Sequence, residues 1–150
     1  MASFPEDLAG ESNPATLLRR TLEFFRAETG TIHLLGPDGQ LHLRAFEGAL
    51  PTPVLEAIRV VPVGKGIAGL AVERGQPVNL CNLQTDDSGA ARPAARTTGA
   101  RGAICVPMLV DGRAVGALGI GTFGERTFTE DEVALLLEAG RRMGARLWNW

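Results

Sequence analysis

Residues 100–140 read ARGAICVPMLVDGRAVGALGIGTFGERTFTEDEVALLLEAG, and this stretch decides the fold. Two apolar runs flank the three residues DGR at 111–113, which indicates a β-hairpin with a tight turn. Because both runs are almost wholly apolar, we expect both faces of the sheet to be covered here. Thr129 and Glu132 have the spacing of a capping box, so an amphipathic helix is predicted to begin directly after the hairpin.

The N-terminal part of the chain has the pattern of a second long helix. Asn13 is suited to cap its first turn, Pro14 fits that turn, and apolar side chains then recur at helical spacing. Gly30 stands just past the expected end of this helix. We expect residues 1–12 to form a flexible leader and residues 13–150 to form a single domain.

Another hairpin is predicted around the turn at residues 36–39. In the simplest register Ile32 pairs with Leu43 on an apolar face, and His33 lies opposite His42 on a polar, partly exposed face. Two imidazoles do not complete a tetrahedral metal site, so no metal is predicted. Between the hairpins we expect two short helices and two short strands, which gives an α+β fold with an antiparallel sheet.

Composition excludes several classes of function. The net charge is −2, there is no tyrosine, and no basic stripe with interleaved aromatic residues appears, which argues against nucleic-acid binding. No apolar run approaches the roughly 18 residues that span a bilayer, and the N-terminus lacks the features of a secretory signal. Two widely spaced cysteines do not make a disulfide framework. We therefore expect a cytoplasmic protein with no membrane partner.

Four stretches together resemble the GAF domain family over roughly residues 14–147. They are ETGTIHLLGPDGQLHLRAFEG (28–48), GKGIAGLAVERGQPVNLCNL (64–83), GARGAICVPMLVDGRAVGALGI (99–120) and FTEDEVALLLEAG (128–140). The resemblance implies an antiparallel sheet of about five to six strands, with the N- and C-terminal helices on one face and a small-molecule cavity on the other. Members of this family commonly sense ligands or mediate dimerisation, and they often act on a separate output domain. We therefore expect a non-catalytic sensor or regulatory module, with a separate signalling output protein as a partner.

The stretch GKGIAG at 64–69 also matches the glycine pattern of dinucleotide-binding sites. That site needs a strand, a crossover helix and a parallel strand over about 30 residues, and too few residues are available here. We interpret these glycines as a tight turn, and we predict no cofactor.

The long segment 84–101 is expected to cover the cavity. Its three arginines could hold an anionic or polar ligand, and Arg101 matters most because it stands at the entry to a buried strand. The alternative is a solvated loop whose charge Asp86 and Asp87 partly balance. The candidate ligand-binding residues are Arg101, Arg96, Arg92, Thr97, Cys81, Asn82 and Cys105.

One enzyme family resembles GAF domains, the free methionine-(R)-sulfoxide reductases, and its members use cysteines around the pocket. A key cysteine of that family corresponds to Ala68 here, and residues 84–101 contain no cysteine. Because one thiol must attack the sulfoxide and a second must resolve the product, this activity is the less favoured alternative. The remaining alternative is a dimerisation or scaffold module without a ligand.

A homodimer is predicted through the terminal helices. Gly140 and Gly144 lie four residues apart in the last helix, where a closely packed neighbour often explains glycine. That neighbour could be the sheet or a second helix. Leu135, Trp148 and Trp150 lie outside the main apolar stripe and suggest more apolar surface than one chain covers.

Overall fold

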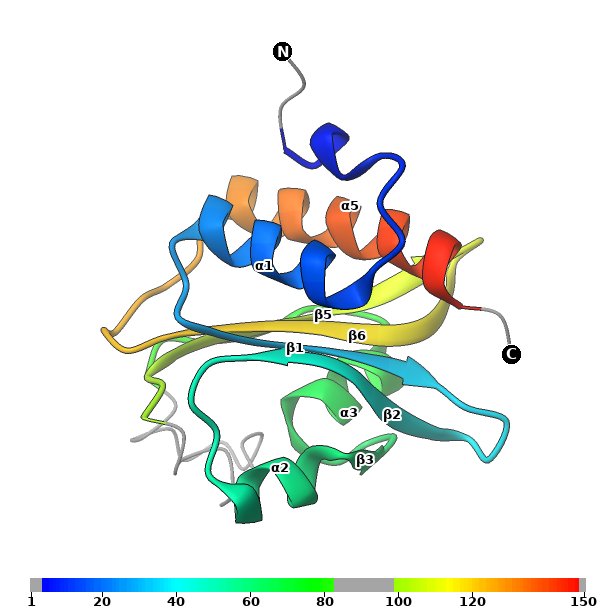
Figure 1. Cartoon of the computed structure of the whole chain (residues 1–150), viewed down its shortest axis with the longest axis horizontal. Coiled ribbons are helices and arrows are strands. Elements are labelled where there is room, and N and C mark those ends of the chain that lie inside the picture. Colours follow the sequence, from blue (N-terminus) through cyan, green and yellow to red (C-terminus); the bar gives the residue numbers. More distant parts are fainter. Residues whose placement is uncertain (1–3, 83–98, 149–150) are drawn as a thin grey trace.

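The computed structural model describes residues 4–82 and 99–148 of the 150-residue chain. A central sheet lies between helices on both sides, with α1 and α5 on one face and α2 and α3 on the other (Figure 1). The helices are η1 (Glu6–Leu8), α1 (Pro14–Phe25), α2 (Thr52–Ile58), α3 (Gly66–Arg74) and α5 (Glu130–Leu147). The strands are β1 (Thr29–Leu35), β2 (Gln40–Glu47), β3 (Val60–Pro62), β4 (Val78–Leu80), β5 (Gly102–Val110) and β6 (Arg113–Thr122).

The sheet confirms the predicted fold class. Within the described residues it has six strands in the order β3-β2-β1-β6-β5-β4, and every neighbouring pair is antiparallel. β1 and β6 pair at the centre, although they come from opposite ends of the chain. The large apolar core lies between this sheet and the helices α1 and α5, and a smaller cluster lies beneath α3.

The β5–β6 hairpin closes with a two-residue turn rather than the three residues expected. Asp111 (φ 52°) and Gly112 (φ 78°) both have positive φ, whereas Arg113 already pairs with Val110. Two consecutive left-handed residues are the mark of a type I′ turn, whose twist matches that of the flanking strands. Arg113 therefore belongs to β6.

The register of the β1–β2 hairpin differs from the prediction. His33 faces Leu43 instead of His42, and beyond a bulge Ile32 faces Ala45 instead of Leu43. The first cause of this shift is the turn, which contains three residues and ends on Gly39 in the left-handed region (φ 78°). The predicted register was centred between Pro37 and Asp38, so the pairing is displaced by one residue. The bulge then adds a further residue on β2.

The two long helices begin where the sequence predicts. The side chain of Asn13 accepts hydrogen bonds from the backbone N–H groups of Ala15 and Thr16, at 2.9 and 3.3 Å. Thr129 and Glu132 form the reciprocal bonds of a capping box at the start of α5. Both helices lie across the same face of the sheet, as Figure 1 shows.

Gly30 lies inside β1, not just past the end of α1 as predicted. The helix ends at Phe25, and Arg26 adopts the left-handed conformation (φ 55°) that often terminates a helix. A Cβ atom at Gly30 would come within 2.9 Å of Leu18 and 3.0 Å of Leu22, which both belong to α1. Glycine is needed here because the helix packs directly on the strand.

The segment expected to be a flexible leader packs on the helices from residue 4 onward. Phe4 and Leu8 are buried in the large core, and the Phe4 ring stacks on Phe24 with ring centroids 4.4 Å apart. Phe4 also makes an edge contact with Phe25. These apolar side chains attach the segment to α1.

The small residues of α5 face the sheet. A Cβ atom at Gly140 would lie 3.5 Å from Met108 and Val106, and one at Gly144 would lie 3.1 Å from Val110. The sequence allowed either the sheet or a second helix as the neighbour of these glycines, and the structure shows that they contact the sheet. Leu135 and Trp148 are half-buried against the core, and Trp148 donates a hydrogen bond to the carbonyl oxygen of Leu35 at 3.3 Å. Trp150 lies outside the described residues.

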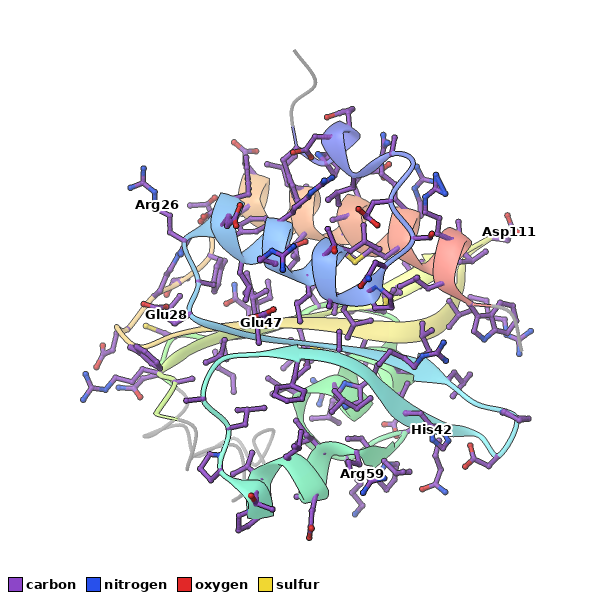
Figure 2. All side chains as sticks on the ribbon, in the orientation of Figure 1. Arg26, Glu28, His42, Glu47, Arg59 and Asp111 are labelled. Carbon is purple, nitrogen blue, oxygen red and sulfur yellow. The ribbon has the colours of Figure 1, made fainter. Side chains whose placement is uncertain are left out.

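Charged side chains lie around the periphery in Figure 2, where Arg26 and Asp111 project outward at opposite ends of the view. Within residues 4–82 and 99–148, none of the helices combines the length and the apolar character required to cross a membrane.

Candidate functional site

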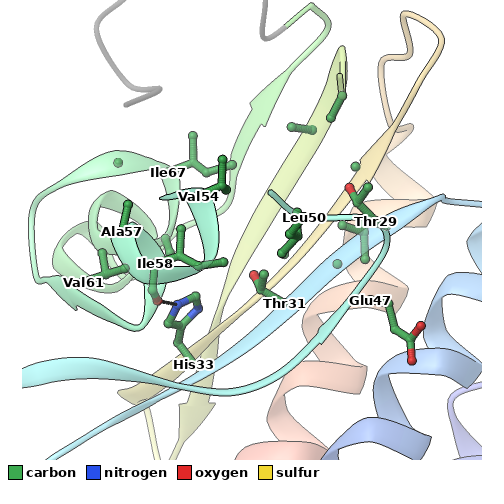
Figure 3. Close-up of a pocket in the computed structure, with 18 of the residues that line it drawn as sticks. Thr29, Thr31, His33, Glu47, Leu50, Val54, Ala57, Ile58, Val61 and Ile67 are labelled. Carbon is green, nitrogen blue, oxygen red and sulfur yellow. Dashed lines mark hydrogen bonds between the residues drawn. The ribbon is translucent and has the colours of Figure 1, made fainter. Parts of the chain in front are cut away.

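A cavity of about 140 Å³ lies between the sheet and the helices α2 and α3. Its floor is the face of β1 and β6 that points away from α1 and α5, where the glycines of β6 leave room. Val54, Ala57 and Ile58 of α2 and Ile67 of α3 form one wall, and Leu50 and Val61 also line the cavity (Figure 3). The lining is therefore mainly apolar, as expected for a small-molecule site.

Polar groups in the lining are few. Thr29, Thr31 and His33 alternate along β1 and present their side chains on the same face, because successive residues of a strand point to opposite faces. Glu47 and Lys65 also line the cavity. Figure 3 shows the carboxylate of Glu47 turned away from Thr31 and His33.

His33 is the most deeply buried of these polar side chains, with 2% of its surface exposed. Its Nε2 atom lies 2.8 Å from the carbonyl oxygen of Ile58 on α2. A carbonyl oxygen only accepts hydrogen bonds, so Nε2 carries the proton and donates it. Nδ1 is buried and has no hydrogen-bond partner among the described residues.

The electrostatics keep this imidazole neutral. Burial lowers the pKa of His33, because removal from water disfavours the charged ring, and the nearby His42 lowers it further. The hydrogen bond to Ile58 acts in the opposite direction and is the smaller effect compared with burial. The cavity therefore presents a neutral ring with one fixed N–H and one free lone pair.

The glycine-rich turn before α3 is explained by packing. A Cβ atom at Gly69 would lie 2.5 Å from the carbonyl oxygen of Pro62 and 3.0 Å from the nitrogen of Gly64. Gly64 has a positive φ of 93°, and its N–H donates to the carbonyl oxygen of Gly69 at 2.9 Å. The neighbouring strands are antiparallel, so the turn is not part of a dinucleotide-binding unit.

Of the candidate ligand-binding residues that the structure describes, none lines the cavity. Arg101 is exposed at the entry to β5 and does not line the cavity, although Ala100 and Ala103 on either side of it do. Asn82 donates a hydrogen bond to Glu125 at 2.7 Å. The other candidates from the covering segment, Arg92, Arg96 and Thr97, lie outside the described residues.

The two cysteines differ in their surroundings, and neither lines the cavity. Cys81 is exposed just after β4. Cys105 is buried in β5 beside Ala71 and Val78, and burial raises the pKa of its thiol to about 12. Because the thiolate is the reactive form, Cys105 is held as an inert thiol.

The most informative residue of the cavity, His33, was predicted to lie on a partly exposed polar face. The alternation of Thr29, Thr31 and His33 against the apolar Ile32 was the available signal. The covering helix α2 could not be placed over this face from its sequence, so the burial of His33 was missed. In the described part of the chain no three metal-binding side chains converge.

Solved structures with the same fold include an enzyme, a GAF domain and a domain of a putative sensor kinase. Free methionine-R-sulfoxide reductase from Neisseria meningitidis, solved with its substrate, has a TM-score of 0.75 at 23% identity, over 93% of this chain and 81% of that chain. The GAF domain of a Coxiella burnetii phosphoenolpyruvate-protein phosphotransferase has a TM-score of 0.75 at 22% identity, covering 93% and 85%. A domain of a putative two-component sensor histidine kinase from Sinorhizobium meliloti has a TM-score of 0.69 at 16% identity, covering 96% and 90%.

These identities are low, so the three likenesses concern the fold. No curated protein sequence matches the chain. The sequence of residues 13–147, however, matches the GAF domain family. The antiparallel sheet with terminal helices on one face and a cavity on the other agrees with that match. The chain belongs to the GAF domain family.

Proposed function

We propose that this GAF domain is a non-catalytic regulatory module that binds a small molecule in the cavity between the sheet and α2. The observation that carries the proposal is the lining itself, which is mainly apolar and contains a few convergent polar side chains on β1. Such a lining suits recognition of an organic molecule by shape, with orientation fixed by a small number of polar contacts.

The cysteines support a binding role over reductase activity. The chain contains two, Cys81 and Cys105, and neither lines the cavity. The position expected to carry a key reductase cysteine is Ala68, which does line it. A thiol mechanism would therefore lack its attacking sulfur at the substrate.

Binding is proposed to act on the terminal helices. Residues of β1 and β6 line the cavity on one face of the sheet, and the same strands carry core residues against α1 and α5 on the other. A ligand that favours one arrangement of these strands can shift the position of the helices and so reach a separate output protein.

The proposed homodimer through the terminal helices has less support than the cavity. The glycines of α5 contact the sheet, and Trp148 packs on its own chain, so these features no longer require a second copy. Phe24 on α1 remains 47% exposed and is the apolar side chain best placed for such a contact. Sedimentation equilibrium at high micromolar protein concentration tests for the homodimer, because the mass of a monomer at that concentration would contradict it.

The ligand can be sought directly. Protein purified under native conditions is denatured, and the released small molecules are identified by mass spectrometry. Ala57→Leu fills the cavity from α2, and Ala134→Leu adds the same atoms at an exposed site on α5. We expect the wild type and Ala134→Leu to release the same compound and Ala57→Leu to release none.

The alternatives give different results. If none of the three proteins releases a compound, and none is stabilised against heat by any member of a metabolite panel, the domain is a scaffold without a ligand. Turnover of free methionine-(R)-sulfoxide with a thioredoxin system would instead establish the reductase and overturn the proposal.

A further inference from the structure

The feature that goes beyond the proposed function is the buried Nδ1 atom of His33. It has no hydrogen-bond partner among the described residues, and the side chain to which it belongs lines the cavity. A buried polar atom without a partner is destabilising, and native proteins contain few of them. An atom of this kind in the wall of a binding cavity is a place where a ligand can supply the missing partner.

The orientation of the ring directs this atom away from α2. In a five-membered imidazole the two nitrogens point in diverging directions, and Nε2 is directed at the carbonyl oxygen of Ile58. Figure 3 shows the hydrogen bond to Ile58 on one side of the ring, with Thr31 on the other side of the cavity floor. Nδ1 is therefore directed away from the carbonyl oxygen of Ile58, and it belongs to a side chain that lines the cavity.

The chemistry of Nδ1 follows from the bond at Nε2. Because Nε2 must carry the proton that it donates to Ile58, Nδ1 carries a lone pair and can only accept. Moving the proton to Nδ1 would break the bond to Ile58, and adding a second proton would charge a buried ring. The arrangement selects a hydrogen-bond donor.

We propose that Nδ1 of His33 accepts a hydrogen bond from the bound molecule, and that this molecule is small, mainly apolar and carries a neutral N–H or O–H donor. The inference rests on the proposed function, since it names the chemical class of the ligand for the same cavity. A charged ammonium donor is disfavoured because the carboxylate of Glu47 is turned away from His33.

The size of the cavity sets the probes. Its volume of about 140 Å³ is about ten times the roughly 10–15 Å³ that holds one water molecule. Indole and phenol fit this class and each carries one donor. Benzofuran and toluene are their counterparts of similar shape without a donor. Affinities for all four are measured by titration, and we expect each donor to bind at least about tenfold more tightly than its counterpart.

A spectroscopic readout follows the atom itself. The chain has two histidines, so His42→Asn leaves His33 as the source of all imidazole nitrogen signals. In this protein, labelled with ¹⁵N, we expect indole and phenol to shift the Nδ1 resonance toward that of a hydrogen-bonded acceptor. Benzofuran and toluene should not shift it in this way.

Two substitutions separate the roles of the ring nitrogens. In His33→Gln the side-chain amide can still donate to Ile58 at the place of Nε2 but offers no acceptor at the place of Nδ1. In His33→Asn the side-chain oxygen can take the place of Nδ1. We expect His33→Gln to lose the preference for donors and His33→Asn to keep it, with thermal melts confirming that both are folded.

The outcomes are distinct. Equal binding of donors and their counterparts to the wild type, a preference that survives in His33→Gln, or an Nδ1 resonance that does not move each overturns this inference while cavity binding stands. If no probe binds, the co-purified compound decides, and a compound without an N–H or O–H overturns it. If no probe binds, no compound co-purifies and no member of the metabolite panel stabilises the protein, the proposed function falls as well.

Discussion

Arg126 joins the start of α5 to the end of α1 through Glu132. Its guanidinium donates one hydrogen bond to the carboxylate of Glu132 and another to the carbonyl oxygen of Phe25, each at 2.5 Å. The same group lies over the ring of Phe128 at 4.4 Å. Glu132 is also a member of the capping box with Thr129. One half-buried arginine thus connects two helices that are far apart in the chain.

Replacing Arg126 by alanine should destabilise the domain by about 1–3 kcal/mol, because a hydrogen-bonded charge and a helix contact are lost together. Urea unfolding followed by circular dichroism measures the change. Arg141→Ala is the matched control, since Arg141 pairs with Glu138 at an exposed site and should have little effect. Equal losses in the two variants would contradict the connecting role of Arg126.

Gly30→Ala should destabilise the domain by about 1–3 kcal/mol, because the new methyl group would press on Leu18 and Leu22. Gly124→Ala is the control, as a Cβ atom there meets nothing within 4 Å. Its effect should stay within about 0.5 kcal/mol. Thermal and urea unfolding check both values, and a Gly30→Ala protein as stable as the wild type would show that α1 does not press on β1.

The buried His33 should make stability depend on pH. Its pKa is lowered in the folded state from an ordinary value of 6.5, so the unfolded chain binds a proton first as the pH falls. The free energy of unfolding should therefore be highest above pH 6.5 and decrease below it. His33→Gln should remove this decrease. The other titratable groups are the same in both proteins, so the difference between the two curves reports His33. Parallel curves for the two proteins between pH 7.5 and 5.5 would contradict the burial of the ring.

The two thiols should react at very different rates. Cys81 is exposed, whereas burial raises the pKa of Cys105 to about 12. A chromogenic disulfide reagent at pH 8 should modify one thiol in the folded protein and two after denaturation. Cys81→Ser should abolish the reaction of the folded protein. A rapid second reaction in folded wild type would mean that Cys105 is accessible.

The parts of the fold that the sequence predicts are those governed by local chemistry. Asn13 and the pair Thr129 and Glu132 satisfy the N–H groups of helix starts within their own segments. The β5–β6 hairpin is likewise predicted from its apolar strands and from Asp111 and Gly112, although its turn is one residue shorter than expected. Each of these features depends on a few neighbouring residues, so no knowledge of the tertiary structure is needed to find them.

The parts that were missed depend on one extra residue or on distant packing. A three-residue turn changes the cross-strand partner of His33 from His42 to Leu43, and a bulge shifts the register further along β1. Neither feature has a strong sequence signal. Gly30 was assigned to a helix end because its real cause, the closeness of Leu18 and Leu22, is a tertiary contact.

The binding site shows the same limit. Arg101 was favoured because it is charged and stands beside a buried strand, yet the cavity is lined by its small neighbours Ala100 and Ala103. Charged residues in the sequence predict the ligand near Arg101, whereas the cavity lies where α2 leaves space over small side chains.

The order of the strands has a consequence for synthesis on the ribosome. β1 (residues 29–35) is made well before its central neighbour β6 (residues 113–122). The nascent chain must therefore hold β1, with one of its two edges unpaired, until β6 has emerged. Unpaired apolar strands are prone to association, so the domain depends on rapid closure of its final hairpin or on protection by a chaperone until then.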